Sequence, residues 1–248
     1  MLARIVSAAL IFSGLTAASG AVTFTVSSTS DPWLAGMPAG ATASLVDVGS
    51  GQSPTQAAGM ALRPGNALRF SATGMTDHCS NGGGCGLAGP DGDSTEGSFR
   101  HATGAENGIA DLFAPIDSLI GVFLDATQPD LGAAPDALDF STLAARDFAS
   151  LSPLLKQPFF IGDGFRNDGV TRQSFIVPEG ATRLYLGTMD GYEWENNTGT
   201  LSVTVMQALE ARALRAQAQA PEPGTLALAL ASLICIRFFR RSRLSAEH

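Results

Sequence analysis

Basic residues are scarce in this chain. The 248 residues include 15 basic and 23 acidic side chains, which gives a formal net charge of −8, and lysine occurs once, at Lys156. Nucleic-acid phosphates attract basic surfaces, so the composition excludes nucleic acid as a partner. An acidic surface favours cation binding or simple solubility.

Histidines and the common catalytic motifs are also few. The chain has three histidines, His78, His101 and His248, and it contains no Gly-x-Ser-x-Gly, His-Glu-x-x-His or Walker sequence. We therefore expect no enzymatic activity. Paired carboxylates for glycoside hydrolysis stay open as an alternative, because their spacing in space does not follow from the sequence.

Long amphipathic helical patterns are absent, whereas short alternating runs between glycine and proline turns recur. This pattern predicts a mainly β fold, an antiparallel β-sandwich of the jelly-roll type. One small helix is expected within 140–149. The expected strands are 22–26, 68–72, 116–124, 159–164, 174–177, 182–186 and 201–205.

The first residues have the composition of a secretory signal peptide. Arg4 precedes an apolar core, and Ser19-Gly20-Ala21 supplies small residues for cleavage near Ala21. A buried first strand or helix is the alternative.

The chain ends with three features in order: Pro221-Glu222-Pro223, an apolar run, and an arginine cluster at Arg237, Arg240, Arg241 and Arg243. The apolar run is short for a bilayer about 30 Å thick, so a buried or interfacial helix is the alternative. The order resembles a PEP-CTERM sorting tail. This resemblance implies a transient inner-membrane anchor and processing by an exosortase-type enzyme. It also implies delivery to the cell surface or extracellular matrix of a Gram-negative bacterium.

Together these features predict four segments: a signal peptide (1–21), a β-sandwich domain (22–205), a stalk (206–220) and a sorting segment (221–248) with a transmembrane helix at 224–239.

Two of the three cysteines, Cys79 and Cys85, flank a glycine-rich stretch, and the third, Cys235, lies in the apolar tail. In an oxidising compartment a local disulfide between Cys79 and Cys85 is expected. Zinc bound by His78 and these two cysteines is the alternative.

Oxygen donors gather in residues 190–199, Asp-Gly-Tyr-Glu-Trp-Glu-Asn-Asn-Thr-Gly, between two expected strands. Calcium takes six to eight oxygen ligands from carboxylates, side-chain amides and backbone carbonyls. A calcium loop and a solvated hairpin with Asn-Asn in the turn are both compatible with this composition.

Residues 184–205 resemble the calcium loop of PA-IL-type galactose-binding lectins, in which calcium bridges the protein and two sugar hydroxyls. The resemblance implies metal ligands at Asp190, Asn196 and Asn197, at the backbone carbonyl of Glu193, and near His78 after an earlier strand. The family's sugar-contacting residues have only positional counterparts, His101 and Asp93. We expect Tyr192 or Trp194 to stack on the sugar, and a core position is the alternative for Trp194.

The sequence thus favours an exported, non-catalytic, calcium-dependent carbohydrate-binding module with an extracellular glycan as its partner. The alternatives are a structural protein of the biofilm or exopolysaccharide that binds no sugar, and a glycan hydrolase.

Overall fold

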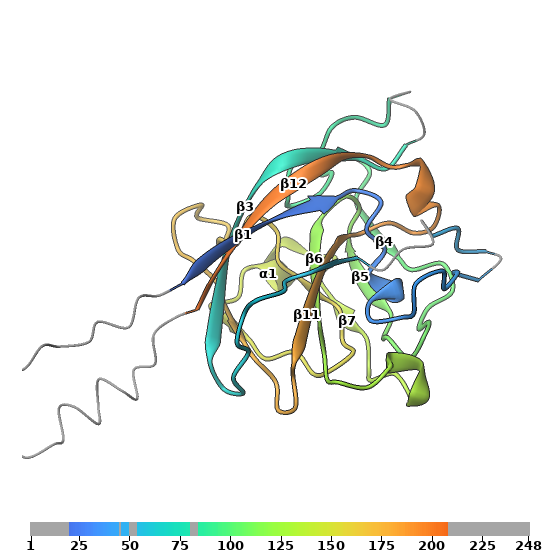
Figure 1. The fold of residues 1–248 in the computed structure, drawn as a ribbon. Coiled ribbons are helices and arrows are strands. Elements are labelled where there is room, and N and C mark those ends of the chain that lie inside the picture. Colours follow the sequence, from blue (N-terminus) through green and yellow to red (C-terminus); the bar gives the residue numbers. More distant parts are fainter. Residues whose placement is uncertain (1–19, 45, 50–53, 80–83, 208–248) are drawn as a thin grey trace, which may run out of the picture. The chain divides into compact units, whose positions relative to one another are not determined.

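The longest strands of the chain lie in one sheet of five. The computed structural model describes residues 20–44, 46–49, 54–79 and 84–207. In this sheet the strand order is β1-β12-β3-β10-β8, and Figure 1 shows β1, β12 and β3 side by side. Their bounds are β1 Ala21–Ser27, β3 Ala67–Asp77, β8 Ser150–Leu151, β10 Ser174–Ile176 and β12 Thr198–Gln207.

Two smaller sheets complete the described β structure. A four-stranded sheet has the order β2-β11-β6-β9, and a three-stranded sheet has the order β4-β5-β7. The strands of the first are β2 Thr55–Gln56, β6 Leu119–Leu124, β9 Phe159–Phe160 and β11 Arg183–Thr188. Those of the second are β4 Ser98–Arg100, β5 Leu112–Pro115 and β7 Leu138–Asp139.

Strand pairing is antiparallel except in two short pairs, β10 with β8 and β5 with β7. The longest ladder joins β12 to β3, from Thr198 opposite Asp77 to Gln207 opposite Leu68. Gly199 has a φ of +100°, and a Cβ there would meet the Met75 carbonyl oxygen at 2.3 Å. Only glycine allows the two backbones to approach this closely at the start of the ladder.

The core receives side chains from both larger sheets. Along β12, Leu201, Val203 and Val205 are fully buried while Ser202 is exposed, as expected for a strand with one face on the core. In the same cluster, Phe70 of β3 contacts Phe175 of β10 edge-on. The four-stranded sheet contributes two stacked rings, Phe123 and Phe159. One hydrophobic cluster therefore holds the two sheets to a common interior.

The fold confirms the expectation of a mainly β chain with antiparallel sheets and little helix. The helix expected within 140–149 is the single turn α1 (Leu143–Arg146). The remaining described helical turns are 3-10 turns: η1 Pro32–Leu34, η3 Pro129–Leu131 and η4 Trp194–Asn196.

Several expected boundaries were wrong. Strand β3 continues five residues beyond the expected 68–72, and β6 begins at Leu119 instead of Ile116. The expected stalk at 206–220 was also wrong at its start, because β12 runs to Gln207 and pairs there with β3.

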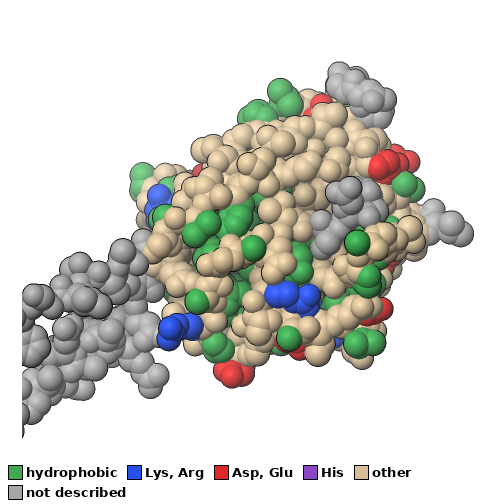
Figure 2. Space-filling model, viewed as in Figure 1, with side chains coloured by type: hydrophobic (Ala, Val, Ile, Leu, Met, Phe, Trp, Pro, Cys, Tyr) green, Lys and Arg blue, Asp and Glu red, His purple; other side chains and the backbone are tan. Residues whose placement is uncertain are grey.

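Three further expectations concern the surface charge, a membrane-spanning helix and the two ends of the chain. On the face in Figure 2, the described Lys and Arg side chains are scattered and do not form a patch. Within the described residues, no helix is long and apolar enough to cross a membrane. The signal-peptide core, most of the stalk and the sorting segment lie outside the described residues.

Candidate functional site

The loop between β11 and β12 is a turn held by hydrogen bonds from its own side chains. Asp190 Oδ1 accepts the backbone N–H of Gly191 at 2.6 Å and that of Tyr192 at 3.3 Å. Glu193 adopts a left-handed conformation with φ 68°, and η4 follows directly. Under this turn Trp194 is fully buried, and its Nε1 donates to the Thr188 carbonyl at 3.0 Å.

Three oxygens in this loop are buried without a hydrogen-bond partner: Asp190 Oδ2, Asn196 Oδ1 and Asn197 Oδ1. In both asparagines the Nδ2 is engaged, in Asn196 by Glu193 Oε2 at 3.0 Å and in Asn197 by the Ser28 carbonyl at 3.2 Å. A buried polar atom without a partner costs roughly 1–3 kcal/mol. Three such oxygens in one short turn fit a bound hard cation, which takes oxygen ligands of this kind.

The raised pKa of Asp190 also fits a bound cation. Burial raises the pKa of Asp190 to about 6, although the Asn197 side chain and the backbone N–H groups of Tyr192 and Gly191 oppose the shift. A nearby cation would restore the ionised form that burial disfavours.

The loop after β3 reaches the same place, as expected. His78 and Cys79 line a hollow of about 360 Å³ together with Asp190, Glu193 and Asn196. His78 Nδ1 lies 2.6 Å from Asp117 Oδ2, and this pair holds the histidine against the turn that precedes β6.

Aromatic side chains border the hollow. Tyr192 and Phe99 line it and are 53% and 37% exposed, respectively. Tyr192 is therefore an accessible ring beside the oxygen cluster, and its contact with a sugar stays a prediction. Phe99 was not foreseen, because it lies on the three-stranded sheet, which the sequence did not reveal.

Cys79 and Cys85 form the expected disulfide, with their Cα atoms 5.5 Å apart. The bond leaves neither cysteine free as a thiolate, so the zinc alternative at His78 loses two of its three ligands.

Trp194 and His101 were wrong as sugar contacts. Trp194 is fully buried, so the core position that the sequence left as an alternative is confirmed. His101 is 2% exposed, with its Nε2 directed at Asp47. Neither ring can reach a ligand on the surface.

Asp93, the other positional candidate for a sugar contact, lines a different hollow, of about 820 Å³, with Asp91, Asp163 and Phe160. There its Oδ1 accepts bonds from the hydroxyl and the backbone N–H of Thr95.

Comparisons with known proteins add little to this geometry. No family model matches the chain, and no curated protein matches it. The chain is similar to a solved structure described as "EclA N-terminal domain; PllA-like lectin", with 14% identity, over 75% of this chain and 95% of that one, at a TM-score of 0.34. At this TM-score and identity the similarity assigns neither a family nor a function to this chain.

Proposed function

We propose that this protein is a non-catalytic, calcium-dependent carbohydrate-binding module. The observation that carries the proposal is the set of three buried, unpartnered oxygens of Asp190, Asn196 and Asn197, in a turn whose Asp190 and Asn196 line a hollow. The fold proposed for it is a jelly-roll-like β-sandwich, supported by the one hydrophobic cluster that the two larger sheets share.

The turn supplies the metal ligands. Asp190 Oδ2, Asn196 Oδ1 and Asn197 Oδ1 would hold the ion, with backbone carbonyls near Glu193 and His78 as further ligands. Calcium, when bound, supplies open coordination positions that vicinal sugar hydroxyls can fill in place of water. The protein's own part is to hold its oxygens in place, which the bonds of both Nδ2 groups accomplish.

Tyr192 provides the apolar contact. Its exposed ring borders the hollow that the metal ligands line, and an aromatic face can bury the CH groups of a sugar ring. Phe99, on the facing strand β4, offers a second apolar surface.

A glycan array with and without chelator tests the proposal. We expect glycan signal with calcium and none with chelator, together with calcium-dependent thermal stabilisation. Stabilisation by calcium without any glycan signal would instead favour a structural protein of the extracellular matrix.

A hydrolase remains the second candidate, and the larger hollow is the observation that favours it. Asp91 and Asp163 both line it, and Asp91 Oδ1 accepts the Asp163 backbone N–H at 2.9 Å. Burial, with the nearby charge of Asp91, raises the pKa of Asp163. Two carboxyls with different environments suit acid–base chemistry. Polysaccharide turnover that Asp163→Asn abolishes would establish this function.

The proposed place of action is the cell surface or extracellular matrix. The signal-peptide pattern and the PEP-CTERM-like tail support export and exosortase-type processing at the inner membrane. Detection of a processed chain outside the cell, lacking residues after Pro223, tests this part separately.

A further inference from the structure

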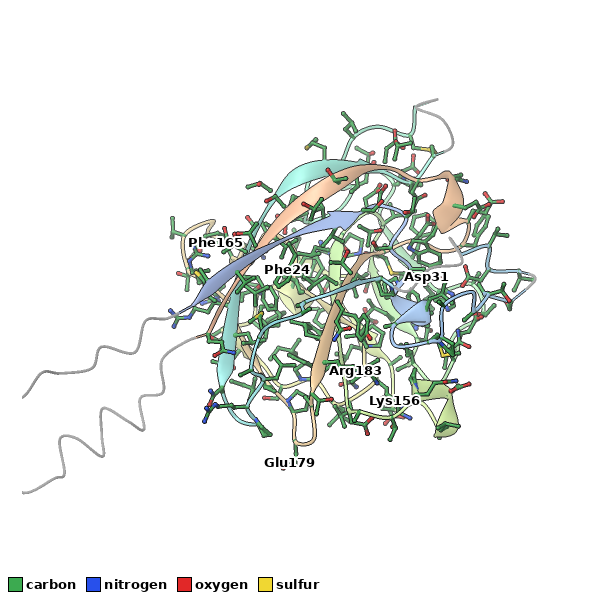
Figure 3. All side chains as sticks on the ribbon, viewed as in Figure 1. Phe24, Asp31, Lys156, Phe165, Glu179 and Arg183 are labelled. Atoms are coloured by element: carbon green, nitrogen blue, oxygen red, sulfur yellow. A yellow bond between two sulfur atoms is a disulfide. The ribbon has the colours of Figure 1, made fainter. Side chains whose placement is uncertain are left out.

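A second polar cluster lies inside the domain, apart from the calcium loop. It joins Asp31, Asp47 and the loop after β4, which carries both His101 and Glu106. Asp31 is the N-cap of the short helix η1 and is labelled in Figure 3. Asp31 and Asp47 are fully buried, and His101 is 2% exposed.

His101 is held in one orientation. Its Nδ1 lies 2.7 Å from the Gly104 carbonyl oxygen, and because a carbonyl can only accept, Nδ1 carries a proton. The Trp33 ring stacks on the imidazole, with centroids 3.9 Å apart and an interplanar angle of 11°. Nε2 is therefore the nitrogen left for another role, the arrangement usual for a metal-binding histidine.

Carboxylates surround that nitrogen. Asp47 Oδ2 lies 2.6 Å and Glu106 Oε2 3.8 Å from His101 Nε2. One ligand atom from each of the three residues fits within 4.8 Å of the others. Both carboxylate oxygens of Glu106 accept hydrogen bonds, which fix its side chain. Oε1 accepts the Ser44 N–H at 2.8 Å and Oε2 accepts the Thr103 hydroxyl at 2.5 Å.

Two oxygens in the cluster are buried with no hydrogen-bond partner, Asp31 Oδ2 and Asp47 Oδ1. Beside the first lies Gly49, where an added Cβ would come within 2.8 Å of Asp31 Oδ2. Three carboxyls and one imidazole lie together here, so the cluster is short of positive charge.

We propose that a divalent metal ion of the zinc class binds here, with His101 Nε2, Asp47 and Glu106 as ligands and the buried carboxyl of Asp31 nearby. The single nitrogen distinguishes this site from the all-oxygen calcium loop, because imidazole suits zinc and its neighbours in the first transition series. On binding, the metal replaces the proton shared between Nε2 and Asp47 Oδ2, and that proton leaves to solvent.

The ion would link the segment around Asp31 and Asp47 to His101, which packs against Trp194 of the proposed calcium loop. Above the cluster, Trp194 contacts both Trp33 and His101, at centroid distances of 5.6 and 5.7 Å. The Ala102 N–H also donates to the Gly191 carbonyl at 2.8 Å. The site is thus structural, and it does not depend on sugar binding by the loop above.

Calorimetry on the whole chain tests the proposal. The protein is stripped with chelator, saturated with calcium to fill the oxygen loop, and titrated with Zn²⁺. We expect one ion per chain to bind, and His101→Gln or Asp47→Asn to weaken binding by about a hundredfold or more. Co²⁺ in place of Zn²⁺ should give a visible absorption band that the same variants lose. His78→Gln, which changes another, partly buried imidazole, is the matched control and should keep the Zn²⁺ affinity of the wild type.

Variants in a buried cluster can fail to fold, so two measurements on folded protein decide the outcome. The partly exposed Glu106 allows Glu106→Gln, whose fold is checked by circular dichroism and whose Zn²⁺ affinity should drop. The Co²⁺ spectrum of the wild type needs no variant at all. Absence of Zn²⁺ and Co²⁺ binding by the wild type would overturn the proposal, as would binding that folded Asp47→Asn or Glu106→Gln retains in full.

Discussion

Asn196 and Asn197 are anchored through their amide nitrogens in different directions, yet both leave Oδ1 buried without a partner. Asn196 Nδ2 donates to Glu193 within the turn, and Asn197 Nδ2 donates to the Ser28 carbonyl at the end of β1. Each bond fixes which side of the amide carries the oxygen. The two neighbouring side chains therefore each keep a buried oxygen acceptor without a partner, the kind of ligand that a hard cation takes.

Tyr192→Ala should separate sugar binding from calcium binding. The ring is exposed and supplies no oxygen to the proposed calcium site, so calcium affinity should stay within about twofold of wild type. Glycan affinity should fall by about tenfold, since a stacked aromatic contributes roughly 0.5–1.5 kcal/mol beyond area burial. Equal losses of both affinities would place Tyr192 in the metal site instead.

Calcium affinity should depend on pH through Asp190. Because its pKa is raised to about 6, calcium must displace a proton below that pH. The affinity should rise with pH up to about 6 and then level off.

Without calcium, Asp190 should also make the stability of the fold depend on pH. Stability should fall with rising pH, whereas calcium affinity rises. The folded pKa of Asp190, about 6, lies above its ordinary value of 3.8, so the folded chain binds more protons between these values. The free energy of unfolding in chelator should fall as the pH rises through this window. In Asp190→Asn the free energy of unfolding should fall less steeply with pH than in the wild type. Denaturant titrations of both proteins across this pH window measure the difference.

Loss of the Cys79–Cys85 bond should be tolerated. The bond closes a small loop, since the cysteines are six positions apart, and the chain-entropy estimate for such a loop is about 2 kcal/mol. A Cys79→Ser, Cys85→Ser variant should lose about that much free energy of unfolding. Because Cys79 lines the hollow, calcium affinity should also weaken, and calorimetry on the folded variant checks this.

Trp194→Ala should destabilise the domain by about 3–5 kcal/mol, as expected for a large buried aromatic. Trp194→Phe keeps most of the packing but removes the bond to the Thr188 carbonyl, so it should cost about 1 kcal/mol. Chemical denaturation measures both. If Trp194→Ala abolished glycan binding and left stability unchanged, Trp194 would be a surface contact after all.

The sequence predicted best where pattern and turn chemistry agreed. Alternation in 201–205 revealed β12, and the local density of oxygen donors in 190–199 revealed the turn. The disulfide was also foreseen, because the two cysteines are close in sequence and compartment chemistry favours the bond.

Other features depend on contacts that no local pattern records. The three-stranded sheet was missed because β4 and β7 are short and pair with β5 across long intervals. His101 was misplaced because its partner Asp47 lies 54 positions away. Trp194 sits in a polar stretch, and only tertiary packing shows that its ring turns inward.

Calorimetric titration of the protein with calcium, beside the double variant Asn196→Ala, Asn197→Ala, tests the calcium site most directly. One calcium ion should bind the wild type, and the double variant should lose this binding while it stays folded. Unchanged affinity in the double variant, or no binding by the wild type at millimolar calcium, would contradict the proposed calcium site.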